Sequence, residues 1–249
     1  MTPIGALVLV GVGLAAGLVS TIASVASFVS YPALLAFGLP PLSANMTNTV
    51  SLLFTGAGAA AGSRPELAGQ GGLIRRFALL AAVGGGAGAA LLLVTPAGTF
   101  QRIAPVLIGA ASFVLLAGWP PTLDAQHAGA RGPLPLAAFF AVAMYVGYFG
   151  AAGGVLMLTV LLAMLAGHIT RVNAVKNVLS GFANLVAAVA FALFGSVDWA
   201  VVPPLAAGFL AGGWLGPAVV RRMPARVLRV GVGACGLAVA VKLALTAYR

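Results

Sequence analysis

Long apolar runs with almost no charged residues most strongly limit what this chain can fold into. A helix needs about 20 apolar residues to cross roughly 30 Å of hydrocarbon, and shorter runs indicate half-helices or re-entrant segments. Near full-length runs cover residues 3–23, 44–62, 73–94, 103–117, 133–150, 172–194, 199–220 and 227–246, and short ones cover residues 28–38 and 155–166. We therefore predict an all-α membrane protein with roughly 8–10 transmembrane helices.

The balance of residue types agrees with a bilayer as the solvent. Of the 249 residues, 61% are hydrophobic and 6% are charged, which leaves too little polar surface to cover a water-soluble globule. The net charge of +10 comes from basic residues between the apolar runs, so it indicates membrane topology rather than nucleic-acid binding. The single cysteine, Cys235, permits neither an intramolecular disulfide nor a thiolate metal cluster. We expect no cofactor.

The two halves of the chain resemble each other. Residues 44–50 (ANMTNTV) align with residues 172–178 (VNAVKNV) at a constant offset, as Asn45 and Asn173 show (173 − 45 = 128). Both halves also contain runs in the order long, short, long, long, long. We predict a duplication, with a first transmembrane repeat at 1–119, a polar cytoplasmic linker at 120–132 and a second transmembrane repeat at 133–249.

The basic residues predict the orientation of the two repeats. With the loop at 64–76 in the cytoplasm, alternating spans place nine arginines on the cytoplasmic side and leave Arg102 and Arg249 outside. Inverted repeats thus satisfy the positive-inside rule, whereas parallel repeats would divide the charge between the two faces. We expect a multi-pass protein with both termini external. Each loop is predicted on the same side of the membrane whether the short runs span the membrane or are re-entrant.

Acids, bases and metal ligands are almost absent from the apolar runs. Glu66, Asp124 and Asp198 lie in loops, and His127 and His168 have no partner at catalytic or metal-ligand spacing. The sequence therefore argues against an enzyme, a metal site and a proton relay built from buried carboxylates.

Small polar residues gather instead at equivalent places in the two repeats. The clusters are Asn45, Thr47, Asn48, Thr49 and Ser51 in the first repeat and Asn173, Lys176, Asn177, Ser180 and Asn184 in the second. Any one of these residues could simply form a hydrogen bond between helices. Their recurrence at equivalent places in both repeats favours a substrate path. Lys176 adds a costly charge within the membrane, although its position five residues after Arg171 also allows it to snorkel to the interface.

A break rich in small residues precedes each short run, at residues 20–27 (STIASVAS) and 147–154 (GYFGAAGG). An unwound backbone there would direct the N–H groups and the positive dipole end of a short helix toward the membrane centre, which suits an anion. Close helix packing through small residues is the alternative. The predicted binding residues are Ser24, Ser27, Asn45, Thr47, Asn48, Thr49, Gly150, Gly153, Gly154, Asn173, Lys176, Asn177 and Asn184.

These strings resemble the sulfite exporter TauE/SafE family of membrane transporters, also called the TSUP family. The resemblance spans nearly the whole chain and rests on residues 44–49, 147–154 and 171–177, the last leading into Asn184 and the turn at 195–199. It implies an inner-membrane transporter of small anions, commonly sulfite, sulfonates or related organosulfur compounds. Residues 23–27 (ASVAS) depart from the glycine-rich break that the family usually shows, so this half-site would bind through serine hydroxyls or hardly at all.

We expect an anion to sit near the midplane between the two short-helix ends, while the repeats rock to expose it to each side in turn. An inside-negative potential favours anion efflux by about 2.3 kcal/mol per charge per 100 mV, so export would need no coupling ion. A membrane scaffold or assembly subunit, whose polar clusters only lock helices together, is the alternative. The sequence does not determine which anion is transported, in which direction, or whether the protein is a carrier or a channel. It also does not show whether the protein is a homo-oligomer.

Overall fold

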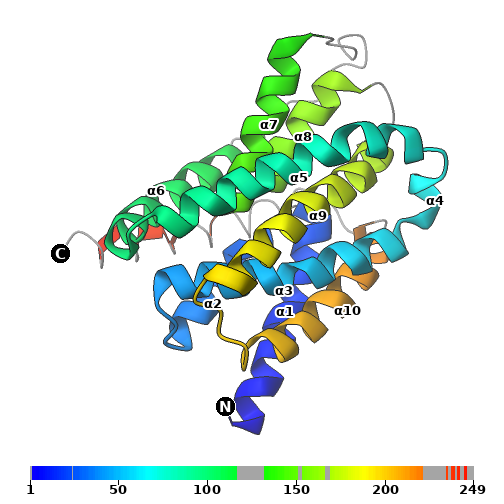
Figure 1. Ribbon diagram of the computed structural model, residues 1–249. Coiled ribbons are helices and arrows are strands. Elements are labelled where there is room, and N and C mark those ends of the chain that lie inside the picture. The colour runs from blue at the N-terminus through cyan, green and yellow to red at the C-terminus, as the bar shows by residue number, and fades with distance from the viewer. Residues whose placement is uncertain are drawn as a thin grey trace.

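The protein folds as a bundle of helices (Figure 1). The computed structural model describes residues 2–23, 25–116, 132–150, 153–165 and 169–220, together with several residues between 234 and 245. The helices are α1 (Pro3–Ala23), α2 (Ser27–Ala36), α3 (Pro41–Gly62), α4 (Arg64–Leu67), α5 (Gly71–Val94), α6 (Ala97–Leu116), α7 (Pro133–Tyr148), α8 (Gly153–Met164), α9 (Ile169–Phe194) and α10 (Val202–Val220). No strand occurs in these described ranges, and the all-α prediction is confirmed for them.

Three helical stretches of the described chain are long and apolar enough to cross a membrane unaided. They are Pro3–Thr21, Gly71–Val94 and Thr170–Phe194, and four further apolar helices, in α2, α7, α8 and α10, are shorter. The number of 8–10 spans stays a prediction. These stretches agree with a membrane protein.

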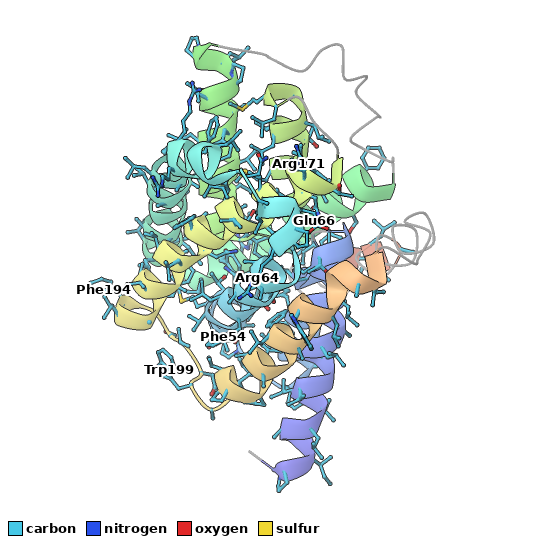
Figure 2. The ribbon with its side chains drawn as sticks, turned by 90° about the vertical axis from the view of Figure 1, so that its right-hand side faces the viewer. Phe54, Arg64, Glu66, Arg171, Phe194 and Trp199 are labelled. Carbon is cyan, nitrogen blue, oxygen red and sulfur yellow. The ribbon has the colours of Figure 1, made fainter. Side chains whose placement is uncertain are left out.

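Large apolar side chains are exposed on the outer surface, and several polar side chains lie in the interior. Leu79 is 73% exposed and Phe194 is 76% exposed, and Figure 2 shows Phe194 and Trp199 projecting from the bundle. Asn45 and Ser51, in contrast, are buried. Many exposed large apolar side chains, together with buried polar residues that face the inside of the bundle, are expected of a protein surrounded by lipid.

Most helix ends lie within a few residues of the predicted runs, and the exceptions have local causes. α6 begins at Ala97 rather than at residue 103, because Gln101 and Arg102 are helical despite being polar. α3 and α7 begin at Pro41 and Pro133, whose fixed φ suits the first turn of a helix. The short helix α4 was not predicted, and most of the run at 227–246 lies outside the described residues.

The contacts between helices follow the predicted duplication: when each helix of a contacting pair is replaced by its equivalent in the other repeat, the new pair is also in contact. α1 packs against α10 and α5 against α7, while α3 contacts α10 and α5 contacts α9 (Figure 1). The duplication makes α1 equivalent to α7, α3 to α9 and α5 to α10. It therefore turns the pair α1–α10 into α7–α5, and the pair α3–α10 into α9–α5. Two-fold related repeats produce this pattern, although the repeat boundaries and the inverted orientation stay predictions.

Glycines allow two of these helix pairs to approach backbone to backbone. A Cβ on Gly85 of α5 would lie 2.6 Å from the Cα of Ala183 in α9, and one on Gly213 of α10 would lie 2.6 Å from the carbonyl oxygen of Thr55 in α3. The two contacts are related by the repeat offset (213 − 85 = 128 and 183 − 55 = 128). They hold α3 and α9, which also contact each other, in the middle of the bundle.

Candidate functional site

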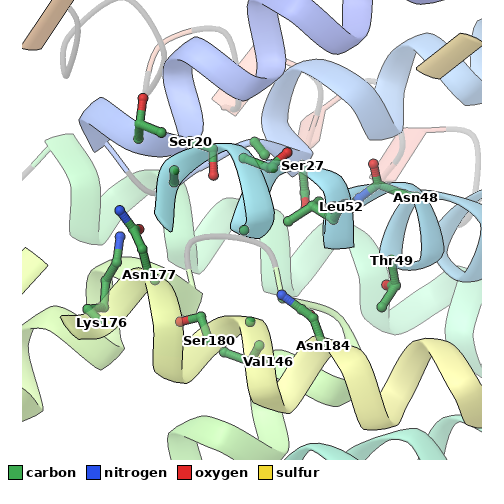
Figure 3. A pocket seen from close by; sticks show the side chains of 18 of the residues that line it. Ser20, Ser27, Asn48, Thr49, Leu52, Val146, Lys176, Asn177, Ser180 and Asn184 are labelled. Carbon is green, nitrogen blue, oxygen red and sulfur yellow. Dashed lines mark hydrogen bonds between the residues drawn. The ribbon is translucent and has the colours of Figure 1, made fainter. Parts of the chain in front are cut away.

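A cavity of about 60 Å³ lies between α3 and α9 (Figure 3). It is centred near the middle of both helices, since Leu52 is the twelfth of 22 residues in α3 and Gly181 the thirteenth of 26 in α9. The lining residues are Ser20, Thr21, Ala26, Ser27, Asn48, Thr49, Leu52, Thr55, Gly56, Ala59, Val146, Phe149, Gly150, Gly154, Lys176, Asn177, Ser180, Gly181 and Asn184. Of these two helices, α9 contains a stretch long and apolar enough to cross a membrane, and the cavity lies beside its middle.

Many lining positions come in pairs separated by the repeat offset. Asn48 is equivalent to Lys176 and Leu52 to Ser180 (176 − 48 = 128 and 180 − 52 = 128). The further pairs are Ala26 with Gly154, Thr49 with Asn177, and Gly56 with Asn184. The cavity therefore takes equivalent positions from both predicted repeats, but it fills them with different side chains.

Three buried polar atoms of the lining have no hydrogen-bond partner among the described residues: Asn48 Oδ1, Thr55 Oγ1 and Ser180 Oγ. A buried polar group that stays unpaired costs about 1–3 kcal/mol, and native proteins keep such groups few. These atoms therefore mark contacts that a ligand or water can complete. Asn48 also donates from Nδ2 to Ser27 Oγ at 3.2 Å, which ties α3 to the start of α2.

Lys176 alone carries a formal charge among the described residues that line the cavity. It is 2% exposed, whereas Arg171 in the first turns of α9 is exposed, so the ammonium of Lys176 does not snorkel to the surface. Figure 3 shows Lys176 and Asn177 next to each other, reaching from α9 toward the side of Ser20. An ammonium at low dielectric attracts anions strongly. No group of three or more His, Cys, Asp or Glu side chains in the described chain could hold a metal ion.

Two predicted binding residues, Asn45 and Asn173, lie outside the lining and join the halves of the chain. Asn45 donates from Nδ2 to the carbonyl of Tyr148 at 3.0 Å, at the end of α7. Asn173 donates from Nδ2 to the carbonyl of Thr21 at 3.4 Å, near the end of α1. Each asparagine thus bonds to the helix that precedes the break of the other half. These contacts fit the structural alternative for the polar clusters.

Glycines flank residues 151–152, which lie outside the described residues, in the break before α8. Gly150 has a φ of +71°, a left-handed conformation that glycine adopts without strain. The N–H of Gly153 donates to the carbonyl of Gly150 at 3.0 Å, so this amide is already satisfied by the protein. Gly150 and Gly154 line the cavity, whereas Gly153 does not.

The break before α2 contributes a side chain to the cavity. The N–H of Phe28 donates to the carbonyl of Val25 at 3.0 Å, so this amide is also used locally. Ser27 lines the cavity, and Ser24 lies outside the described residues. Another predicted residue, Thr47, is not in the lining and accepts a hydrogen bond at Oγ1 from the N–H of Asp198 at 2.9 Å.

The cavity brings together eight of the predicted binding residues: Ser27, Asn48, Thr49, Gly150, Gly154, Lys176, Asn177 and Asn184. Their role in binding stays a prediction. Ser20, Thr21 and Thr55 line the cavity but were not predicted as binding residues. Ser180 belongs to the second polar cluster but was also not among the predicted binding residues. A signal for Thr55 exists in the sequence, because it follows Asn48 by seven residues and so lies on the same helix face.

Comparison with protein families gives a match over nearly the whole chain. The family model described as Sulfite exporter TauE/SafE matches residues 9–243, a range that includes every residue of the cavity lining. The match confirms the resemblance seen in the sequence strings. No curated protein and no solved structure matches the chain.

Proposed function

The chain belongs to the sulfite exporter TauE/SafE family of membrane transporters, and from this premise we propose that it exports a small anion, such as sulfite or a related organosulfur anion. One observation carries the proposal. The cavity between α3 and α9 combines a buried lysine with amide and hydroxyl groups, near the middle of the two central helices. That combination suits a small anion removed from water.

The anion would be held mainly from α9. The ammonium of Lys176 supplies the attraction that offsets the loss of hydration, and Asn177 and Ser180 supply hydrogen-bond donors beside it. Thr55 would donate from α3 through a hydroxyl that has no partner in the described protein. An anion in this position contacts both predicted repeats, so a relative motion of the repeats changes its access.

We propose that access alternates by rocking of the two repeats about the cavity. The hydrogen bonds of Asn45 and Asn173 connect the two halves of the chain, so they join helices that would move relative to each other. Outward movement of an anion is downhill in an inside-negative membrane by about 2.3 kcal/mol per charge per 100 mV. No chemical step is required, so we propose a transporter that is not an enzyme, placed in the inner membrane with both termini external.

Anion flux through purified protein in liposomes tests this function. We expect Lys176→Met to lower sulfite flux at least tenfold, because a tenfold change corresponds to only about 1.4 kcal/mol and a buried ammonium contributes more than that to anion binding. Arg171→Met is the matched control, because it removes an exposed charge from the same helix.

Two results would contradict the proposal. Unchanged flux in Lys176→Met would remove Lys176 from the transport mechanism. Absence of flux from well-folded wild-type protein, judged by a single symmetric peak in size-exclusion chromatography, would favour the scaffold alternative.

A further inference from the structure

A second hollow, which we call the α5–α7–α8 groove, lies where the starts of α5 and α7 meet the end of α8. Its lining includes Leu73, Arg76 and Phe77 from α5, Leu136 from α7 and Met164 from α8. None of these residues lines the cavity between α3 and α9. The groove is therefore a separate feature of the molecule.

Most of the described lining of the groove is apolar. Leu73 and Met164 are partly buried and pack against the second core cluster, whereas Leu136 is 37% exposed. Phe77 is buried, and its ring centre lies 5.3 Å from that of Phe139 in α7. Apolar surface that stays accessible between helices marks a place where another apolar molecule binds. In a membrane protein, an acyl chain of a lipid suits such a surface.

Arg76 is the charged side chain among the described residues of this lining. Its guanidinium carbon lies 5.7 Å from the centre of the Phe77 ring, and the side chain is exposed. No acidic residue in the described lining neutralises its charge. A guanidinium donates two parallel hydrogen bonds to a phosphate, so Arg76 suits a phosphate group at the edge of an apolar surface.

Two helix starts add to the attraction for a phosphate. α5 begins at Gly71 and α7 begins at Pro133, and neither first turn has a side-chain cap from its described N-cap residue. The N–H groups at the start of a helix attract anions. Gly72 lines the groove, and a Cβ added there would meet no atom within 4 Å, so the space beside the first turn of α5 is open.

The opposite end of the molecule lacks the matching charges. The repeat offset makes Arg75 equivalent to Pro203 and Arg76 to Pro204, at the start of α10 (203 − 75 = 128 and 204 − 76 = 128). The predicted topology places the two arginines at the cytoplasmic surface, because they belong to the loop at 64–76. The cytoplasmic leaflet carries anionic lipids, so charge complementarity favours an anionic phospholipid at this end.

We propose that the α5–α7–α8 groove binds one anionic phospholipid of the cytoplasmic leaflet. Its phosphate lies at Arg76 and the first turn of α5, and an acyl chain follows the apolar side chains of α5, α7 and α8. The proposal does not depend on the transport function. It does connect the two predicted repeats, since α5 belongs to the first and α7 and α8 to the second.

Native mass spectrometry of the purified full chain, titrated with phosphatidylglycerol or phosphatidylcholine in detergent, tests this site. Wild-type protein should bind one phosphatidylglycerol about fivefold more tightly than phosphatidylcholine, the factor that corresponds to the roughly 1 kcal/mol supplied by one arginine near anionic lipid. Arg76→Met should abolish this preference. Arg75→Met is the matched control, because it removes the neighbouring exposed charge from outside the described lining, and it should keep most of the preference.

Gly72→Asp tests the same site without removing any contact. The added carboxylate lies beside the phosphate and repels it, so the preference for phosphatidylglycerol should be lost. An acidic residue in the first turn of a helix is favourable, so the midpoint of thermal unfolding without lipid should be unchanged or raised. Loss of lipid binding is then distinguished from loss of fold.

Four results would overturn the proposal. The first is equal binding of the two lipids by the wild type. The second is a preference that both Arg76→Met and Gly72→Asp leave unchanged, which would place the lipid elsewhere. The third is displacement of the lipid by an equal concentration of free glycerol phosphate, which would indicate a site for a soluble phosphate compound. The fourth is a dimer that Leu136→Arg disrupts, with no lipid bound to the wild type, which would assign the groove to a second copy of the chain.

Discussion

Gly181 offers a test in which cavity volume and protein stability change in opposite ways. It lines the cavity from α9, and a Cβ at this position would meet no atom within 4 Å. Gly181→Ala therefore adds a methyl group to open space. The substitution also improves helix propensity by up to about 1 kcal/mol, so the fold should be unchanged or slightly more stable.

The added methyl group should weaken binding of the anion. A methyl group at this position takes up space in the cavity that the proposed anion would occupy. Overpacking costs about 1–3 kcal/mol, which corresponds to binding weakened by about 5- to 100-fold. We expect a reduction in sulfite flux within this range, together with a midpoint of thermal unfolding in detergent that is unchanged or raised.

Gly11→Ala is the control for this experiment. A Cβ on Gly11 also meets nothing within 4 Å, but Gly11 lies on α1 away from the lining, so flux should be unchanged. If Gly181→Ala transports like the wild type, the anion does not occupy this cavity as we describe. If the variant loses flux and also unfolds at a lower temperature, the assignment of open space beside Gly181 is wrong.

Three further predictions concern packing and topology. Gly85→Ala should lower the free energy of unfolding by about 1–3 kcal/mol, because a Cβ there would come closer than 3.0 Å to three backbone atoms of Ala183. Chemical denaturation should show a larger loss than for Gly213→Ala, where only the carbonyl oxygen of Thr55 would lie within 3.0 Å. Asn45→Leu should cost about 1–3 kcal/mol by leaving the carbonyl of Tyr148 unpaired, and Asn173→Leu should cost less because its bond is longer; equal losses would contradict this order. Cysteines placed at Thr2 and at the C-terminal residue should react with an impermeant thiol reagent in intact cells, and protection of either one would refute external termini.

Much of the fold follows from the sequence because the bilayer simplifies the problem. Spanning segments must be helical to satisfy their backbone hydrogen bonds, so apolar runs predict both the type and the approximate bounds of the helices. The recurrence at Asn45 and Asn173 also anticipates which helices are equivalent, and the exchange of the contact pairs agrees with it. Hydropathy did not find the true start of α6, because polar residues in its first turns are helical without being apolar.

The site was harder to predict than the fold, because it depends on side-chain direction. Residues of one polar cluster diverge: Asn48 faces the cavity, whereas Asn45, three residues earlier, bonds to the end of α7. Thr55 lies outside its cluster in sequence but on the same face as Asn48. The sequence alone could not decide whether the Lys176 side chain faces the interior or snorkels to the membrane interface, since Lys176 is only five residues from Arg171. Burial in the folded bundle decides it.

The location of a bound anion tests the central claim most directly. We propose a structure determined in the presence of selenite, a heavier trigonal oxyanion whose selenium gives an anomalous signal. We expect an anomalous peak within the cavity between α3 and α9, with oxygen atoms at hydrogen-bond distance from Lys176 Nζ and Ser180 Oγ. A saturating peak elsewhere in the protein, with this cavity filled by water alone, would contradict it.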